Sequence, residues 1–297
     1  MIAALLDGHS SVFAMPWHDK LADLFLSHDF DKNIAVQMGG QAYLIYILMK
    51  LYSDTGWPEL QTSSMQNELV VPVKHDYSAR IHIEFDFHKL ENKIIRQAKN
   101  IIDLNPSNFI NMVFENLLEV FKPEIKSSCK YYLSMARNGF RDFDAFFTTY
   151  PYSKILYARR PFVDWYYAFC FRAAHGDHSK MSGMIPYLAA YDGRMGNLLW
   201  LEKNIDRLQS QYPDRLKIIE FEDLITSHKE VMKNVAAFLG INYENVMYNT
   251  TALGVPIDLV GEIKDKVGEI ITSNEKALIE QVVTSLPPPP PPPPPKA

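Results

Sequence analysis

Two consecutive arginines, Arg159 and Arg160, follow a short apolar segment at residues 154–158 and precede Pro161. A guanidinium group presents its N–H donors in a fixed fork and stays charged, so it suits a phosphate or another dianion. The carboxyl end of a parallel strand is also where open α/β sheets bind their ligands. The two arginines are therefore candidates for anion binding. A solvated or ion-paired arginine pair at a strand end is the alternative.

The segment before the arginines has a counterpart later in the chain. Residues 154–158 (KILYA) and 216–221 (LKIIEF) are both short and apolar, as buried strands are. Each leads directly into helical sequence, at residues 163–174 and 227–239 respectively. Repeated strand-then-helix order predicts an α/β fold with a parallel sheet flanked by helices.

This arrangement would bring side chains from the two segments together. We expect residues 154–158 and 216–221 to be buried, parallel strands of one sheet. Because their carboxyl ends then meet at the same edge, Arg159 and Phe221 are expected to lie near a shared cleft. The helix after the second strand is expected to stop at Gly240, since glycine readily adopts the left-handed conformation of a helix end.

Most of the region between residues 21 and 147 has a helical pattern, with apolar spacing at residues 89–102 and 109–121. Residues 80–87 (RIHIEFDF) instead alternate apolar and polar side chains, which is typical of a strand or hairpin. We interpret residues 21–147 as a large helical insertion on the acceptor side of the cleft.

Composition narrows the classes of function. The 297 residues include 30 Lys and Arg against 35 Asp and Glu, for a formal net charge of −5. A protein that coats nucleic acid needs surplus basic side chains, so this balance argues against a nucleic-acid partner. Cys129 and Cys170 cannot build a disulfide framework, and no Cys/His cluster has zinc spacing. From this cysteine usage we expect a reducing, cytoplasmic location. We also expect no membrane span, because no apolar stretch reaches the roughly 18 residues required.

The two ends of the chain differ from the rest. Residues 2–6 have the pattern of an amphipathic helix that stops at Gly8. Nine consecutive prolines occupy residues 287–295 and favour an extended polyproline II rod. We therefore expect one folded domain over residues 1–286 and an extended or disordered tail over 287–297. The tail is either a spacer or a proline-rich motif for the aromatic-lined groove of a partner.

Three segments of the chain carry a family resemblance. Residues 5–10 read LLDGHS, residues 150–161 read YPYSKILYARRP, and residues 216–224 and 235–241 read LKIIEFEDL and VAAFLGI. They resemble, in the same order, three parts of the sulfotransferases that use 3'-phosphoadenosine-5'-phosphosulfate (PAPS). These parts are the stretch after the phosphosulfate loop, the strand and turn with the 3'-phosphate-binding arginine, and the Tyr-Glu-Asp-Leu … Phe-Leu-Gly run. The resemblance implies a P-loop NTPase-like sulfotransferase fold, sulfuryl transfer from PAPS to a hydroxyl or amine, and no metal.

The resemblance assigns nucleotide-binding roles to four residues. Arg159 stands where the family has its 3'-phosphate-binding arginine, and a slip of one residue in the turn would give that role to Arg160. Tyr167 replaces the family's serine, so either its phenol donates from a shifted backbone or that contact is lost. Phe221 replaces a tyrosine that lies by the adenine, and stacking needs only a π face. Phe221 is otherwise the last core residue of its strand.

A transferase of this kind also needs a general base to activate the acceptor. In related enzymes a base follows the first helix, and His18 and Asp19 occupy that place here. Asp19 either orients His18 or is the base itself, and the pair is otherwise a surface contact. Glu84 and His88, within and just after the alternating segment, are a second candidate set.

The family's phosphosulfate loop, similar to Arg-x-Gly-Thr-Thr, would precede residues 2–6, and the chain as given begins inside that helix. We expect a late start codon or a gene fragment, and weak turnover by the chain from Met1. Two alternatives remain: a catalytically impaired, sulfotransferase-like binding scaffold, and a P-loop small-molecule kinase. The acceptor, whether small molecule, carbohydrate or peptide, does not follow from the sequence.

Overall fold

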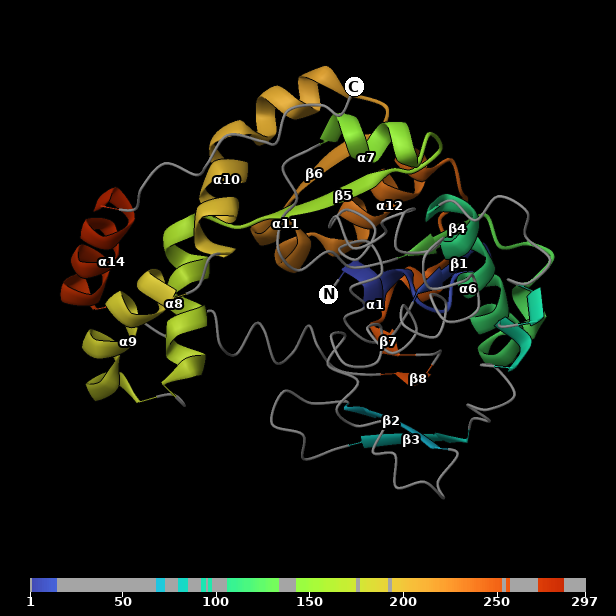
Figure 1. Ribbon diagram of the computed structural model, residues 1–297, viewed down its shortest axis with the longest axis horizontal. Helices are drawn as coiled ribbons and strands as arrows, with labels where there is room; N and C mark the ends of the chain where they lie inside the picture. The colour runs from blue at the N-terminus through green and yellow to red at the C-terminus, as the bar shows by residue number, and fades with distance from the viewer. Residues whose placement is uncertain are drawn as a thin grey trace, which may run out of the picture. The chain divides into compact units, whose positions relative to one another are not determined.

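The computed structural model describes residues 2–14, 68–72, 80–84, 92–94, 96–97, 106–133, 143–174, 177–191, 194–252, 255–256 and 272–285. The chain divides into two compact units. Unit 1 is Met1–Arg137 with Gly240–Gly261, and unit 2 is Asn138–Leu239 with Glu262–Ala297. The described residues combine helices with short strands, some of them paired in parallel, which agrees with the α/β class predicted from the sequence (Figure 1).

The described residues of unit 1 form short strands, helices, and further helical residues at 92–94 and 96–97. Its elements are α1 (Ile2–Leu6), β1 (Val12–Ala14), β2 (Glu68–Pro72), β3 (Arg80–Glu84), α6 (Pro106–Phe121), η1 (Pro123–Ile125), β4 (Tyr131–Leu133), η2 (Asn245–Tyr248), β7 (Thr251–Ala252) and β8 (Val255–Pro256). β1 pairs with β4 in parallel, whereas β2 with β3 and β7 with β8 pair antiparallel. The strand predicted within residues 80–87 is β3, and the helix predicted at 109–121 is α6. The other strands of this unit, β1, β2, β4, β7 and β8, were not predicted.

The N-terminal helix ends as its sequence predicts. Leu5 and Leu6 of α1 are fully buried, and Gly8 follows in the left-handed region with φ +83°. Asp7, between them, is buried and accepts a hydrogen bond from Nζ of Lys122 at 2.6 Å. The hydroxyl of Thr251 lies 2.7 Å from the other carboxylate oxygen. This buried ion pair therefore fastens α1 to the residues that follow α6 and to β7.

His9 is also held inside unit 1. The backbone N–H of Ser11 donates to Nδ1 of His9 at 2.9 Å, so the ring proton must sit on Nε2. Nε2 in turn donates to the carbonyl oxygen of Asn242 at 2.8 Å. The segment that resembles the family's stretch after the phosphosulfate loop thus has a structural role in this unit.

Unit 2 contains the strands predicted to carry the arginines. Its elements are α7 (Phe143–Thr149), β5 (Ile155–Arg159), α8 (Phe162–Ala173), α9 (His178–Tyr191), α10 (Arg194–Gln211), β6 (Leu216–Glu220), α11 (Phe221–Thr226), α12 (His228–Leu239) and α14 (Ser273–Ser285). β5 and β6 lie side by side and parallel, as predicted, from the Ile155–Leu216 pair to the Arg159–Glu220 pair (Figure 1). The helices predicted after them are α8 and α12, and α12 ends at Gly240 with φ +69°.

The expected burial of both strands is confirmed only at two residues of β6, whose other three residues are half-buried. Leu216 and Ile219 are 0% and 3% exposed, whereas β5 is half-buried and its Ala158 is exposed. Among the described residues β5 pairs with β6 alone, which leaves its other edge without a described strand partner. The prediction of a buried strand at residues 154–158 was therefore wrong.

One core cluster supports the strand pair from α7 and α10. Its buried members are Phe143, Phe147, Leu201, Ile205, Leu208 and Leu216. Arg215, just before β6, spans the start of both strands: its guanidinium lies over the Phe147 ring at 4.0 Å and donates to the carbonyl oxygens of Tyr150 and Ser153 at 2.5 and 3.1 Å. These contacts fix the register in which β5 enters the pair.

A second core cluster joins α8, α9 and α14. Its buried members are Tyr166, Tyr167, Cys170, Ala174, Met181, Ile185 and Ile279. Both cysteines are free thiols, Cys170 buried and Cys129 half-buried. None of the helices in the described ranges is long and apolar enough to cross a membrane.

Candidate functional site

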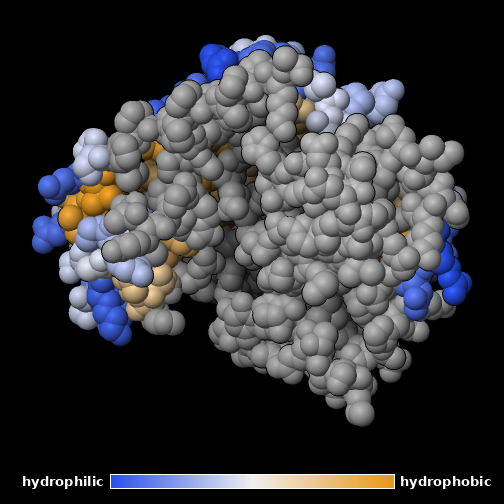
Figure 2. All heavy atoms as spheres, in the orientation of Figure 1, coloured by the Kyte–Doolittle hydropathy of each residue, from blue (hydrophilic) through white to orange (hydrophobic). Residues whose placement is uncertain are grey.

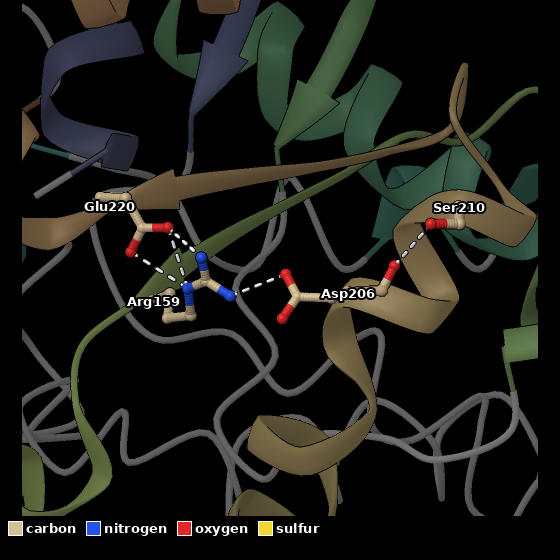
Figure 3. Close-up of polar contacts among 4 residues, drawn as sticks. All are labelled: Arg159, Asp206, Ser210 and Glu220. Carbon is tan, nitrogen blue, oxygen red and sulfur yellow. Dashed lines mark hydrogen bonds and ion pairs between the residues drawn. The ribbon is translucent and has the colours of Figure 1, made fainter.

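Arg159 ends β5 and is bound by two carboxylates. Its Nε donates to both carboxylate oxygens of Glu220, at 2.9 and 3.0 Å, and one terminal nitrogen also contacts Glu220. The other terminal nitrogen lies 2.8 Å from Oδ1 of Asp206 on α10 (Figure 3). Glu220 is the partner of Arg159 in the strand register, so the pair closes the carboxyl end of the β5–β6 ladder. The charge of this guanidinium is thus already balanced within unit 2.

Glu202 is a third carboxylate that interacts electrostatically with Arg159. The hydrogen bonds that Arg159 donates to Glu220, with a smaller contribution from the one to Asp206, raise the pKa of Arg159, although burial acts the other way. Burial raises the pKa of Glu202, although the charge of Arg159 opposes this. Burial also raises the pKa of Tyr157 to about 12. A phosphate dianion at Arg159 would have to compete with these carboxylates for one guanidinium.

Arg160 lies in a different environment from its neighbour. Successive residues at the end of a strand point to opposite faces, and here Arg160 turns toward Phe221. Its guanidinium carbon is 5.0 Å from the centre of the half-buried Phe221 ring, a cation–π contact. Within the described part of the chain no carboxylate is paired with Arg160. The structure therefore brings Phe221 together with Arg160, whereas Arg159, the residue expected beside Phe221, is bound to Glu220.

Two helices begin at this edge. α8 starts at Phe162, two residues after Arg160, and α11 starts at Phe221 itself. Free backbone N–H groups at a helix start favour negative charge, and the 12-residue α8 supplies such a start beside a guanidinium. Arg160 and Phe221 together offer a cation and an aromatic face, and the first turn of α8, which also carries Asp164, follows Arg160 in the chain. This combination suits a phosphorylated aromatic ligand.

Tyr167 is a core residue of unit 2. It is 4% exposed and belongs to the cluster formed by α8, α9 and α14. Its ring stacks on that of Phe171 at 5.8 Å. Of the two alternatives left by the sequence, this placement favours loss of the second phosphate contact.

Of the candidates for the general base, only Glu84 lies among the described residues. His18, Asp19 and His88 lie outside the described residues, and Glu84 is the last residue of β3. In the described ranges, no group of three or more His, Cys, Asp or Glu side chains is arranged to hold a metal ion.

Sequence reasoning missed the acids that bind Arg159. Glu220 was recognised only as part of an apolar strand, and Asp206 was not singled out, because no helix was predicted over the residues of α10. One signal could have predicted the ion pair. The sequence has an acid at the end of one predicted strand and an arginine at the end of the other, and parallel register aligns the two ends.

We compared the chain with protein-family models, with curated proteins and with solved structures, and found no match.

Proposed function

We propose that this chain is a PAPS-dependent sulfotransferase of the P-loop NTPase-like fold, with the nucleotide bound at the carboxyl ends of β5 and β6. The observation that carries the proposal is the contact between Arg160 and Phe221 at this edge. A 3'-phosphate and an adenine ring need a guanidinium and an aromatic face close together. The resemblance of residues 5–10, 150–161 and 216–241 to the family supplies the identity of the nucleotide.

Within this proposal the two arginines have different roles. Arg160 contacts the 3'-phosphate, because Arg159 is already bound to Glu220 and Asp206. Arg159 holds the ends of β5 and β6 together and so positions Arg160 and Phe221. Adenine stacks on the face of the Phe221 ring that is opposite Arg160. Tyr167 makes no contact with the nucleotide in this scheme.

The proposed reaction is attack by an acceptor hydroxyl or amine on the sulfur of PAPS. The bond between that sulfur and the 5'-phosphate oxygen breaks, and its electron pair leaves with 3'-phosphoadenosine-5'-phosphate (PAP). His18, or Asp19 in its place, takes the acceptor proton. The acceptor is a small molecule, a carbohydrate or a peptide. The proposed compartment is the cytoplasm, where thiols such as Cys129 and Cys170 stay reduced.

Nucleotide preference tests the proposal on the chain as it exists. PAP is expected to raise the melting temperature, because a ligand that binds only the folded state stabilises it, whereas ATP with magnesium is not. Arg160→Ala should abolish the shift given by PAP. Arg207→Ala, which removes an exposed guanidinium from α10, is the matched control and should keep it. Stabilisation by ATP with magnesium but not by PAP would favour a kinase, and stabilisation by neither would refute the nucleotide site.

A further inference from the structure

Three carboxyl groups surround the single guanidinium of Arg159. Glu220 binds Nε and one terminal nitrogen, and Asp206 binds the other terminal nitrogen at 2.8 Å (Figure 3). Glu202 is the third. It precedes Asp206 by four residues on α10, so the two side chains lie on the same side of the helix, one turn apart. We call these four residues the Arg159 cluster. Its three acids outnumber its one cation.

Glu202 differs from the other two acids in its contacts. Within the described part of the chain, Arg159 donates its hydrogen bonds to Glu220 and Asp206 and none to Glu202. The half-buried Glu202 therefore lacks the contact that would best stabilise its charge. Burial raises the pKa of Glu202, the charge of Arg159 opposes this, and the charges of Glu220 and Asp206 add to it. Glu202 is thus the member of the cluster that we expect to bind a proton.

The groups that act electrostatically on Glu202 come from three elements. Among the described residues they are Arg159 on β5, Glu220 on β6 and Asp206 on α10 itself. Tyr157 on β5 also interacts electrostatically with Glu202, and burial raises the pKa of Tyr157 to about 12, so its phenol stays neutral near pH 7. Arg159 is therefore the cation for which Glu202 competes.

Asp206 is the partner of Arg159 that an ionised Glu202 most readily displaces. Like charges four residues apart on a helix repel each other. The side chain of Asp206 is 74% exposed and contacts one nitrogen of Arg159, whereas Glu220 is 38% exposed and contacts two. Figure 2 shows hydrophilic atoms at the position of α10, so water is available to a displaced Asp206 carboxylate.

The Arg159 cluster is joined directly to the edge that carries Arg160 and Phe221. Arg159 precedes Arg160 in the chain, Glu220 precedes Phe221, and Arg159 and Glu220 are partners in the strand register. Asp206 connects this pair to α10. Loss of that connection would let the end of β5 move, and the Arg160–Phe221 contact at 5.0 Å would change with it.

We propose that the Arg159 cluster is a proton-operated clamp. With a proton on Glu202, Arg159 binds Glu220 and Asp206 and holds Arg160 beside Phe221. When Glu202 loses the proton, its carboxylate replaces Asp206 at Arg159, the end of β5 shifts, and Arg160 binds an anion less well. The clamp itself concerns unit 2 alone, whereas its effect on ligand binding rests on the proposed function.

Fluorine NMR of the full chain tests the clamp. Phe221 is replaced by 4-fluorophenylalanine, and its resonance is followed between about pH 4 and about pH 9. We expect a titration step in the wild type, whereas Glu202→Gln should keep the low-pH position throughout. Glu280→Gln, which removes an exposed carboxyl group from α14, is the matched control and should titrate like the wild type. A wild-type resonance that does not titrate would overturn the clamp, as would an equal step in Glu202→Gln.

Asp206→Asn provides a second variant. It weakens the contact that the clamp is proposed to release, so its titration step should be smaller than that of the wild type. A step of full size would contradict the exchange of Asp206 for Glu202.

The clamp also fixes the sign of a stability difference. A carboxyl group whose pKa is raised on folding stabilises the protein below its unfolded pKa, about 4.3 for Glu, and this contribution is lost as the pH rises through the folded value. Glu202→Gln and the wild type should thus melt at similar temperatures at about pH 4, and the variant should melt higher at about pH 8. A variant that melts lower than the wild type at about pH 8 would overturn the clamp.

PAP affinity separates the clamp from the proposed nucleotide site. The ratio of the Kd of the wild type to that of Glu202→Gln should rise several-fold between about pH 5 and about pH 8, since ionisation of the phosphates of PAP affects both chains equally. A constant ratio would overturn the link to ligand binding. A Phe221 resonance that titrates as expected in a chain that does not bind PAP would support the clamp and refute the proposed function.

Discussion

The guanidinium carbon of Arg160 lies 5.0 Å from the centre of the Phe221 ring, at the point where β5 and β6 end and α8 and α11 begin. The contact unites a cation and an aromatic face that are 61 residues apart in the chain. Arg159, one residue earlier, is neutralised by Glu220 and Asp206. The two adjacent arginines are therefore expected to have separable effects: Arg160 on the proposed ligand binding and Arg159 on stability.

Phe221→Leu should weaken PAP binding while leaving the fold intact. Leucine keeps an apolar side chain at the half-buried position but has no π face for adenine, and stacking contributes about 1–3 kcal/mol per base. The expected loss is roughly 5- to 150-fold in Kd, measured by isothermal titration calorimetry. Phe221→Tyr is the matched control and should bind PAP like the wild type. Equal affinities for the Leu and Tyr variants would remove Phe221 from the nucleotide site.

Arg159→Gln should destabilise unit 2. The substitution removes the bidentate pair with Glu220 and leaves Glu220 and Asp206 without their cation. Hydrogen bonds to charged groups contribute about 1.5–3 kcal/mol each, and the side chain of Asp206 is 74% exposed, so most of the effect comes from Glu220. We expect about 1.5–3 kcal/mol less free energy of unfolding in urea. Arg207→Gln, on the exposed side of α10, should change it by less than about 0.5 kcal/mol. Similar losses in the two variants would contradict the structural role of Arg159.

The local pattern of the sequence was sufficient to find β5, β6, α8 and α12. Each is identified by short apolar runs or helical spacing, and Gly8 and Gly240 mark helix ends that glycine alone occupies without strain. The ion pairs of Arg159 could not be predicted from local pattern, because its partners Asp206 and Glu220 are 47 and 61 residues away in the chain. Which of the two adjacent arginines pairs with a carboxylate depends on the face of the sheet to which each side chain points.

The burial of β5 was misjudged for a related reason. An apolar run such as KILYA shows that a segment can be a strand but not how many strands flank it. β4 escaped notice because three residues, Tyr131–Leu133, are too few to show alternation, and their parallel partner β1 lies more than 100 residues earlier. Pairing between distant segments is decided by the packing of the whole unit rather than by local pattern.

Three Gly→Ala substitutions should rank in a definite order. At Gly8, φ is +83° and an added Cβ would lie 2.9 Å from Cγ2 of Val246, so both backbone strain and overpacking apply. We expect a loss of about 2–4 kcal/mol there. Gly240 has φ +69° but no atom within 4 Å of the added Cβ, so strain alone should cost about 1–2 kcal/mol.

Gly183→Ala is the matched control for these two variants. Gly183 lies inside α9, and its added Cβ would meet nothing within 4 Å. Alanine should therefore stabilise the protein by about 0.5–1 kcal/mol. Thermal unfolding of the three variants checks the order. A Gly8→Ala variant as stable as Gly240→Ala would show that Val246 moves aside without cost.

Glu275 should make the stability of α14 depend on pH. Burial disfavours its charge, but hydrogen bonds from His178 and Thr272 outweigh burial and lower the pKa of Glu275. A carboxyl group whose pKa is lowered on folding stabilises the protein fully above its unfolded pKa, about 4.3 for Glu. That contribution is lost as the pH falls through the lower folded value.

The melting temperatures of the wild type and of Glu275→Gln should therefore converge as the pH is lowered from 7 to 3. The exposed Glu280 on the same helix provides the control, and Glu280→Gln should follow the wild type throughout. A wild-type advantage over Glu275→Gln that stays constant down to pH 3 would show that the carboxylate does not stabilise α14.

The buried pair of Asp7 and Lys122 should be the most sensitive site in unit 1. Their side chains are only 3% and 6% exposed, and the carboxylate also accepts the Thr251 hydrogen bond. Removing one partner leaves an uncompensated buried charge, which costs about 3–5 kcal/mol, whereas removing both charges together costs much less.

Lys122→Met alone should thus lower the free energy of unfolding by about 3–5 kcal/mol, and Asp7→Asn alone by a similar amount. The double variant should lose less than the sum of the two, by at least about 1 kcal/mol, in a double-mutant cycle measured in urea. Strict additivity would mean that the two side chains do not stabilise each other and that another interaction holds α1 in place.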